Sequence, residues 1–218
     1  MSANQDSTPA GDVIDIGPAL SLRGTRMHFD RNAEIFGEEE PAEYIYRVVS
    51  GAVRTIRFSA DGRRQILAFH MPGDVFGVEI GGAHSCTAEA INACEIVMVR
   101  RSLLEKAASE DVRAARQWLE LTGQDLRKAQ DHTLILGHKG AGERVAAFLL
   151  RFADRLARGA DVELPMSRAD IADYLCLTIE TVSRALTELE RRCAIALPTS
   201  RHVVMRSRSA LMQLEAAA

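Results

Sequence analysis

Short β-rich runs that are broken by turns make up the first regular pattern along the chain. Residues 44–58 read YIYRVVSGAVRTIRF, and residues 65–71 read QILAFHM. Asp61-Gly62 between them is a typical hairpin turn, and the next corner falls at Pro72–Asp74. Because these runs follow one another without intervening helical patterns, they favour an antiparallel barrel or jelly roll over βαβ units.

The pattern becomes helical between Glu110 and Leu136. Apolar and small residues recur there at alternating spacings of three and four, namely Val112, Ala115, Leu119, Thr122, Leu126, Ala129, Thr133 and Leu136. A heptad seam of this length predicts a parallel coiled-coil dimer. The alternative is a single amphipathic helix packed on its own domain, because Ala and Thr make a weak seam that needs support from other contacts.

The C-terminal section predicts a helix, a strand, two further helices and a hairpin. Residues 143–157 (ERVAAFLLRFADRLA) have a helical period, and Val162–Met166 reads as a short strand. Ser167 and Thr178 are expected N-caps on either side of the corner Leu175–Leu177, and Asp170 takes the reciprocal capping position after Ser167. After Arg192, the segment IALPTSRHVVMRS alternates like a hairpin that turns near Pro198–Ser200. This order is that of a winged helix-turn-helix.

In such a motif, the N-terminal residues of the second helix lie on the base edges of the major groove. The predicted base-reading residues are Ile179, Glu180, Ser183 and Arg184. Glutamate accepts a hydrogen bond from cytosine N4, and arginine donates two to guanine. The alternative for Glu180 and Arg184 is a plain ion pair within the helix. The predicted phosphate contacts are Ser167, Arg168, Thr178, Thr181, Arg201 and His202.

Composition and charge agree with a globular DNA-binding protein. The 218 residues are 47% hydrophobic, and the net charge is −3. The C-terminal section is less acidic than the rest, and local charge decides binding at short range. Its arginines cluster at Arg184, Arg191, Arg192, Arg201, Arg206 and Arg208. No apolar run approaches the roughly 20 residues of a membrane span, and the N-terminus lacks the pattern of a signal peptide, so we expect a cytoplasmic location and no membrane partner.

Several of these segments resemble the CRP/FNR superfamily of transcription regulators. IETVSRAL, with Glu180-x-x-Ser183-Arg184, is similar to the FNR-type recognition helix. AEYIYRVVSGAVRT, DGRRQILAFHMPGDVFG and ERVAAFLLRFADR resemble the FixK branch, which activates genes for low-oxygen respiration and nitrogen fixation. The resemblance covers about residues 25–215. It implies a homodimeric activator that binds palindromic TTGA-N6-TCAA-like duplexes and contacts RNA polymerase.

The resemblance also implies an α+β fold with four sections. Residues 1–24 are expected to be a flexible segment, and residues 25–108 an antiparallel β-roll like a cyclic-nucleotide-binding jelly roll. Residues 109–138 are expected to form the dimerisation helix, and residues 139–218 the winged helix-turn-helix.

Departures from the family motifs bear on the effector. The cyclic-AMP-binding members place an Arg-Ser pair where this chain has His84-Ser85, and a neutral histidine does not replace the permanent charge of arginine. Iron–sulfur members use three N-terminal cysteines and a central one. Cys94 resembles the central cysteine, but the first 85 residues contain none, so we expect Cys94 to be a small buried hydrophobe. We therefore expect no cofactor and no metal.

Two alternative functions stay open at this point. One is a haem- or nitric-oxide-responsive regulator, for which the chain offers His28, His70, His84, His132, His138 and His202. The other is a cupin-like metalloenzyme that uses His70, Glu79 and His84 as metal ligands. These three residues lack the spacing of that family, so we do not expect an enzyme.

Two turns also depart from the family. Similar proteins often carry glycine where Cys176 stands, because a positive φ is commonly wanted there, and a non-glycine residue in that conformation costs about 1 kcal/mol. Either Cys176 accepts this cost or the corner bends differently. Cys176 is therefore either redox-sensitive, so that oxidation adds bulk or charge beside the recognition helix, or a tolerated small residue packed against the core. The run Glu38–Glu40 replaces a Gly-Asp turn and is expected to be a solvated loop. All four cysteines are expected to be free thiols.

Overall fold

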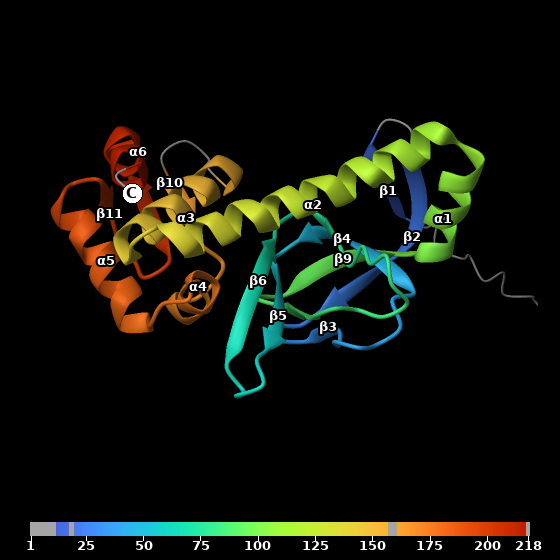
Figure 1. The fold of residues 1–218 in the computed structure, drawn as a ribbon, viewed down its shortest axis with the longest axis horizontal. Coiled ribbons are helices and arrows are strands. Elements are labelled where there is room, and N and C mark those ends of the chain that lie inside the picture. Colours follow the sequence, from blue (N-terminus) through green and yellow to red (C-terminus); the bar gives the residue numbers. More distant parts are fainter. Residues whose placement is uncertain (1–11, 18–19, 157–160, 217–218) are drawn as a thin grey trace, which may run out of the picture. The chain divides into compact units, whose positions relative to one another are not determined.

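The computed structural model describes residues 12–17, 20–156 and 161–216 (Figure 1). The chain divides into two compact units that do not follow sequence order. The first takes the chain up to Val53 together with His70–Thr122, and the second combines Arg54–Phe69 with Gly123–Ala218. The hairpin that the sequence assigns to the β-roll therefore groups with the C-terminal section.

Antiparallel strands build the first unit. One sheet has the order β1-β2-β9-β4-β7, and β3 pairs with β8. The strands are β1 (Asp12–Gly17), β2 (Leu20–Phe29), β3 (Glu34–Phe36), β4 (Tyr44–Ser50), β7 (Val75–Phe76), β8 (Thr87–Ala90) and β9 (Cys94–Arg100). Gly51 follows β4 with φ 81°, and a Cβ there would lie 2.5 Å from Cβ of Cys94, so only glycine fits this turn. The predicted antiparallel β-roll is confirmed.

Two clusters of buried side chains form the core of this unit. One gathers Phe36, Tyr46, Phe76 and Ile96, and the other gathers Ile14, Leu20, Val99 and Leu104. Leu104 lies on α1 (Arg101–Glu110), a helix that the sequence analysis did not predict because it placed residues up to 108 in the β-roll.

The N-terminal strands correct a second expectation. Residues 12–17 and 20–24 lie in β1 and β2, which pair from Asp12↔Gly24 onward, and not in a flexible segment. The pairing of β2 with β9 holds this hairpin on the sheet, and that long-range contact leaves little trace in the local sequence. Residues 1–11 lie outside the described residues.

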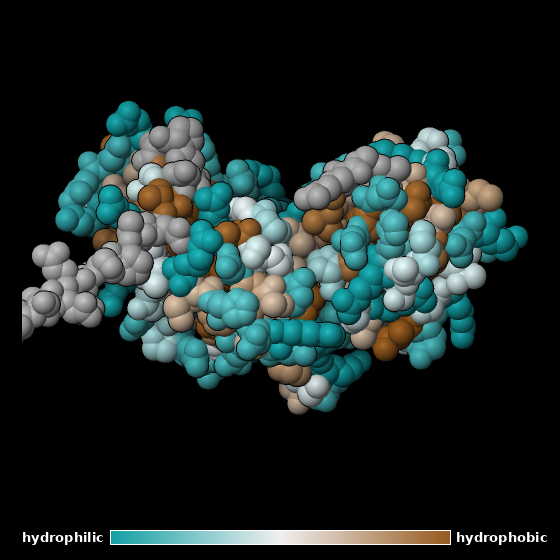
Figure 2. All heavy atoms as spheres, turned by 180° about the vertical axis from the view of Figure 1, so that it is seen from behind, coloured by the Kyte–Doolittle hydropathy of each residue, from teal (hydrophilic) through white to brown (hydrophobic). Residues whose placement is uncertain are grey.

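Helix α2 (Val112–His138) coincides with the predicted heptad segment. Oδ1 of Asp111 accepts a hydrogen bond from N of Arg113 at 2.8 Å and so caps the first turn. Ala114 and Ile135 are buried, whereas Val112, Leu119 and Leu126 are exposed. Hydrophobic residues also occur at several places among hydrophilic ones in Figure 2, so exposure alone does not distinguish α2. Among the described residues, no helix is long and apolar enough to cross a membrane.

From α3 onward, the second unit has the predicted order of helix, strand, helix, corner, helix and hairpin (yellow to red in Figure 1). Its elements are β5 (Val53–Phe58), β6 (Arg64–His70), α3 (Ala141–Leu156), β10 (Asp161–Glu163), α4 (Arg168–Leu175), α5 (Ile179–Arg191), β11 (Ile195–Ala196), β12 (His202–Met205) and α6 (Arg208–Ala216). Strands β10, β12 and β11 form one antiparallel sheet. The predicted winged helix-turn-helix is confirmed, and α6 is an addition to it.

An aromatic cluster forms much of the core of this unit. The rings of Phe148 and Phe152 on α3 lie 6.4 and 5.7 Å from that of Phe69 on β6, and Phe69 lies 5.1 Å from Tyr174 on α4. Aromatic pairs at such distances contribute beyond their buried area. The hairpin β5–β6 turns at Asp61-Gly62 as predicted, with Gly62 at φ 77°.

Arg144 on α3 ties three backbone segments together. Its guanidinium donates to the carbonyl oxygens of Leu136 at 2.8 Å, Lys139 at 2.8 Å and Leu175 at 3.1 Å. These oxygens lie at the C-terminal ends of α2 and α4, where helix carbonyls lack partners of their own. One side chain therefore satisfies the ends of two helices.

Candidate DNA-binding interface

The first helix of the motif begins with a reciprocal cap. Oγ of Ser167 accepts from N of Asp170 at 3.1 Å, and Oδ2 of Asp170 accepts from N of Ser167 at 3.0 Å. This is the predicted capping box, with aspartate in place of the usual glutamate. Burial alone would raise the pKa of Asp170, but the hydrogen bonds from Ser167 and the charges of Arg54 and Arg64 together lower it. The carboxylate is therefore ionised at neutral pH.

Cys176 forms the corner between α4 and α5. Its φ of 53° and ψ of 47° are left-handed, so of the two alternatives Cys176 adopts the positive φ and the corner does not bend differently. The side chain is exposed, so the expectation that it packs against the core is wrong. Its Sγ donates to Oε1 of Gln65 at 3.2 Å, and the hairpin β5–β6 supplies that partner.

Thr178 caps the second helix, as predicted. Its Oγ1 accepts from N of Thr181 at 3.2 Å. The apolar side of α5 is buried through Val182, Leu186 and Leu189. The predicted base-reading residues lie between these apolar residues in the sequence but on the other side of the helix. Burial of the apolar side therefore places the predicted base-reading residues on the outer side.

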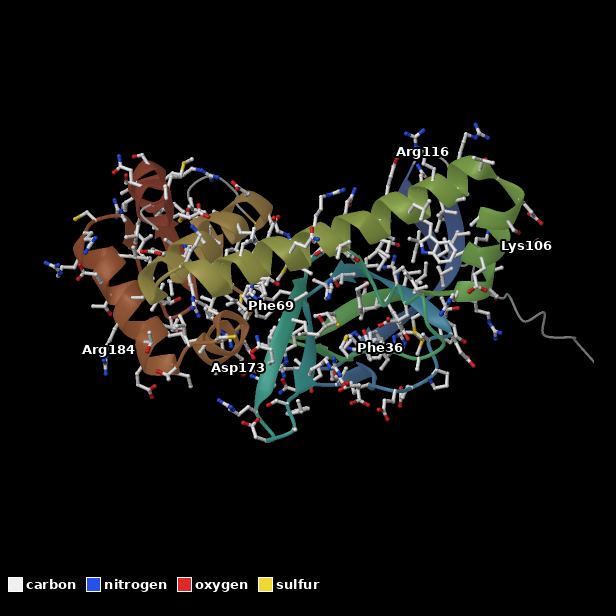
Figure 3. The ribbon with its side chains drawn as sticks, in the orientation of Figure 1. Phe36, Phe69, Lys106, Arg116, Asp173 and Arg184 are labelled. Carbon is white, nitrogen blue, oxygen red and sulfur yellow. The ribbon has the colours of Figure 1, made fainter. Side chains whose placement is uncertain are left out.

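The predicted base readers lie on the N-terminal half of α5. Ile179, Glu180 and Arg184 are exposed, and Ser183 is half-buried. Arg184 projects away from the helix in Figure 3. The pKa of Glu180 is lowered first by its own backbone N–H and by the hydroxyl of Thr178, and Arg184 contributes least. The charge of Arg184 is therefore only a minor influence on Glu180.

Arg168 connects the two helices. It is half-buried, and its Nη1 donates to Oγ of Ser183 at 3.3 Å. Its Nε is buried, and no hydrogen-bond partner for it is found among the described residues. The structure therefore brings a predicted phosphate contact against a predicted base reader.

The wing carries two further predicted phosphate contacts, Arg201 and His202. Oγ1 of Thr199 accepts from N of Arg201 at 3.3 Å and from N of His202 at 3.0 Å, and these bonds shape the turn between β11 and β12. Both side chains are half-buried. Nε2 of His202 lies 3.1 Å from Oδ1 of Asp161 on β10, so this ring is already engaged within the domain.

Two other arginines of the cluster have partners on α5 itself. Nε of Arg191 and Nε of Arg192 donate to the carboxylate of Glu188 at 2.8 and 2.6 Å. These bonds, from Arg191 first, lower the pKa of Glu188 to about 2. The two arginines place positive charge at the C-terminus of the helix, where it interacts favourably with the helix dipole.

Neighbouring side chains of the β-roll engage the pair His84-Ser85. His84 is 2% exposed and stacks on Phe36 with 3.7 Å between ring centroids. Burial lowers its pKa, against the charges of Glu79 and Glu40. Oε1 of Glu79 accepts from N and Oγ of Ser85 at 3.0 and 2.8 Å. His84 therefore packs against Phe36, and Ser85 is bound by Glu79.

The neighbouring acidic run and Cys94 also have structural roles. Glu39 has φ 69°, its N donates to O of His84, and N of His84 donates to O of Glu40. The run Glu38–Glu40, in which Glu39 and Glu40 are exposed and Glu38 is half-buried, is therefore fixed by its backbone. Cys94 is 1% exposed, and burial raises its pKa to about 11. The prediction of a small buried hydrophobe is confirmed. Within the described ranges, no group of three His, Cys, Asp or Glu side chains is placed to hold a metal ion.

The sequence analysis missed the contacts of hairpin β5–β6 with α4. Arg54 and Arg64 contact Asp170, which is more than a hundred residues away in the chain. An arginine on a strand carries no local signal of such a partner, because surface arginines are common. Only the three-dimensional arrangement identifies these residues.

Comparison with known proteins agrees with this arrangement. Residues 143–214 match the Crp-like helix-turn-helix domain, and residues 26–111 match the cyclic nucleotide-binding domain. The nitrogen fixation regulation protein FixK of Azorhizobium caulinodans is 46% identical over 221 residues, which cover 99% of this chain and 86% of that protein. FixK of Rhizobium meliloti is 39% identical over 216 residues, or 98% of each chain.

A solved structure gives the same result at the level of the fold. The structure of FixK2 from Bradyrhizobium japonicum has a TM-score of 0.88 and 52% identity, and the match covers 90% of this chain and 100% of that one. The relatives are named as regulators, and the chain is a DNA-binding transcription regulator and not an enzyme. It belongs to the CRP/FNR superfamily, in its FixK-like branch.

Proposed function

We propose that this protein is a homodimeric activator that reads TTGA-N6-TCAA-like palindromes at genes for low-oxygen respiration or nitrogen fixation. The observation that carries the proposal is the outer side of α5, where Glu180 and Arg184 are exposed at the start of a capped helix. The names of the FixK relatives support the physiological setting. Binding to chromosomal DNA would place its action in the cytoplasm.

Four side chains would read each half-site. Arg184 would donate two hydrogen bonds to a guanine, and the ionised Glu180 would accept from a cytosine N4. Ile179 would contact a thymine methyl group, and Ser183 would contact a base edge while Arg168 holds its hydroxyl. The phosphate contacts would come from both ends of the motif, through Ser167, Arg168, Thr178, Thr181, Arg201 and His202.

The seam of α2 would join two copies. Val112, Leu119 and Leu126 are 85, 73 and 59% exposed at heptad spacing, and such a row of apolar side chains calls for a partner. The hydroxyls of Thr122 and Thr133 donate to carbonyls four residues earlier, so these polar groups are satisfied within the helix. Ala115, Ala129 and Leu136 complete the proposed contact. A symmetric dimer would present its recognition helices to major grooves about 34 Å apart.

The DNA-bound dimer would act without a cofactor and would activate transcription through contact with RNA polymerase. The engagement of His84 and Ser85 supports the first part, because Glu79 already accepts two hydrogen bonds from Ser85 and His84 is already stacked on Phe36.

Purified, reduced protein would be titrated onto a TTGA-N6-TCAA duplex and onto a duplex with both half-sites scrambled, at two salt concentrations. We expect tight binding to the palindrome, and its loss in Arg184→Ala. Arg191→Ala is the matched control, because it removes the same charge from the same helix at a residue paired with Glu188. Equal binding to both duplexes, or equal losses in the two variants, would contradict the proposal.

We propose in addition that oxidation of Cys176 weakens DNA binding. The thiol is exposed at the corner that precedes α5, and oxidation to a sulfinic acid would add a negative charge there. Binding would be measured before and after peroxide treatment, with Cys176→Ala as the control. Affinity that is unchanged by oxidation of the unmodified protein would exclude this switch.

A further inference from the structure

A buried cluster of charges joins hairpin β5–β6 to the first helix of the DNA-binding motif. Oδ1 of Asp170 accepts from Nη1 of Arg54 at 3.0 Å and from Nη2 of Arg64 at 2.9 Å. Nε of Arg64 also donates to Oδ2 of Asp173 at 2.8 Å. The side chains of Arg54 and Asp170 are 10 and 6% exposed, so water screens this contact little.

An uncharged residue extends the contact to the other end of α4. Nε2 of Gln65 donates to the carbonyl oxygen of Asp173 at 2.7 Å, and its Oε1 accepts from Sγ of Cys176. The hairpin thus holds the first turn of α4 through Asp170 and its last turn through Asp173 and Cys176. Figure 3 shows Asp173 on α4 and Phe69 on β6, whose ring adds an apolar contact with Tyr174.

The Asp170 carboxylate that accepts hydrogen bonds from the two arginines also takes part in the N-terminal cap of α4. Oδ2 of Asp170 accepts from N and Oγ of Ser167, while Oδ1 faces Arg54 and Arg64. A buried charge that loses its partner is strongly destabilising, so removal of an arginine disturbs the turn that Ser167 caps. Arg168, the next residue, then links α4 to Ser183 on α5.

We infer that Arg54 and Arg64 are positioning residues for DNA recognition, which hold α4 and, through Arg168, the recognition helix in the reading orientation. They do so from the hairpin, without touching DNA. This inference rests on the proposed reading of bases by α5. It assigns a stretch of the β-roll sequence, Arg54–Phe69, to the DNA-binding machinery.

Arg64→Ala and Arg63→Ala in the full-length protein form the test. Arg63 carries the same charge on the same hairpin, and its ion pair is with Asp61 at the turn. In Arg64→Ala we expect binding to the palindrome to weaken at least fivefold and binding to the scrambled duplex to change less than twofold. Equal effects in the two variants would overturn the inference.

Salt dependence separates positioning from direct contact. If Arg64 acts through α4, the slope of log K against log salt is the same in Arg64→Ala as in the unmodified protein. Loss of a phosphate contact would flatten that slope by about 0.9, and this result would also overturn the inference.

Amide hydrogen exchange of residues 168–175 tests the inference without DNA. We expect faster exchange in Arg64→Ala and unchanged exchange in Arg63→Ala, and unchanged exchange in both would overturn the inference. If the unmodified protein binds both duplexes equally, the proposed function fails, but the exchange measurement still tests whether Arg64 holds α4.

Should Arg64→Ala not fold, the double variant Arg64→Asp with Asp173→Arg is compared with Arg64→Asp alone. Restored folding and slower α4 exchange in the pair are expected, and no rescue would overturn the inference.

Discussion

Two exposed side chains four residues apart, Glu180 and Arg184, carry the proposed base reading. They are exposed because the buried side chains of Val182, Leu186 and Leu189 fix the rotation of α5 about its axis. Thr178 fixes where the helix begins. Both side chains are exposed, so their replacement tests DNA recognition without a large effect on stability.

Glu180→Ala is expected to relax sequence specificity. Loss of one base-specific acceptor costs about 1–3 kcal/mol on the duplex that carries the matching cytosine and little on duplexes with another base there. Binding would be measured on duplexes that vary one half-site base at a time. A uniform change across all these duplexes would contradict the role of Glu180, because it would indicate a general charge effect.

His132 gives a prediction about pH at the level of packed helices. It lies on α2, and its ring stacks on that of Tyr174 on α4 with 4.0 Å between centroids. Burial, aided by the charge of Arg151, lowers its pKa to about 4. The unfolded chain therefore binds a proton here that the folded protein does not, between about pH 6.5 and 4.

The contribution of His132 to stability is complete above pH 6.5 and declines as the pH falls toward 4. His132→Phe keeps the ring stack and removes the titration, so its free energy of unfolding is expected to depend less on pH in that window. Urea unfolding at several pH values would measure this difference. His28→Phe, at an exposed residue of β2, is the control, and an unchanged pH dependence in His132→Phe would contradict the argument.

Only one side of helix α2 carries the proposed dimer contact. Two equally exposed leucines of this helix therefore provide a test substitution and its control. Leu126 and Leu134 are 59 and 58% exposed, but only Leu126 lies on the heptad seam. Leu126→Glu is expected to shift the protein to monomers, and Leu134→Glu to leave the dimer intact. Analytical ultracentrifugation over a range of concentrations would show this. Equal behaviour of the two variants would exclude the seam.

Local sequence patterns predicted the elements with strong periods and caps. Helix α2 followed from its heptads, and α4 and α5 followed from Ser167, Asp170 and Thr178. Helices α1 and α6 and strand β1 were missed, since each is short and depends on tertiary contacts. The partners of Arg54 and Arg64 were beyond prediction, because charges separated by more than a hundred residues meet only once the chain has folded.

At the scale of the whole molecule, a DNA-binding regulator carries a net charge of −3. The arginines of the C-terminal section supply positive charge where phosphate contacts are proposed, and at short range this local charge outweighs the net charge.

The spacing between the half-sites tests whether one rigid dimer binds both of them together. Insertion of about 5 base pairs between the half-sites turns one of them by roughly half a helical turn. We expect affinity to fall to that of a duplex with a single half-site, because a rigid dimer then reaches only one site at a time. Gel-shift titration would measure it. Affinity that is insensitive to the insertion would mean that each half-site is bound by an independent copy.

Arg144 limits how the helix-turn-helix can move. Its guanidinium bonds to carbonyls at the ends of both α2 and α4, so the last turns of these helices share one joint. Lysine, with a single ammonium on a flexible stem, would not make both hydrogen bonds in this geometry. The end of α4, which directly precedes the recognition helix, is therefore tied to the end of α2 through one side chain.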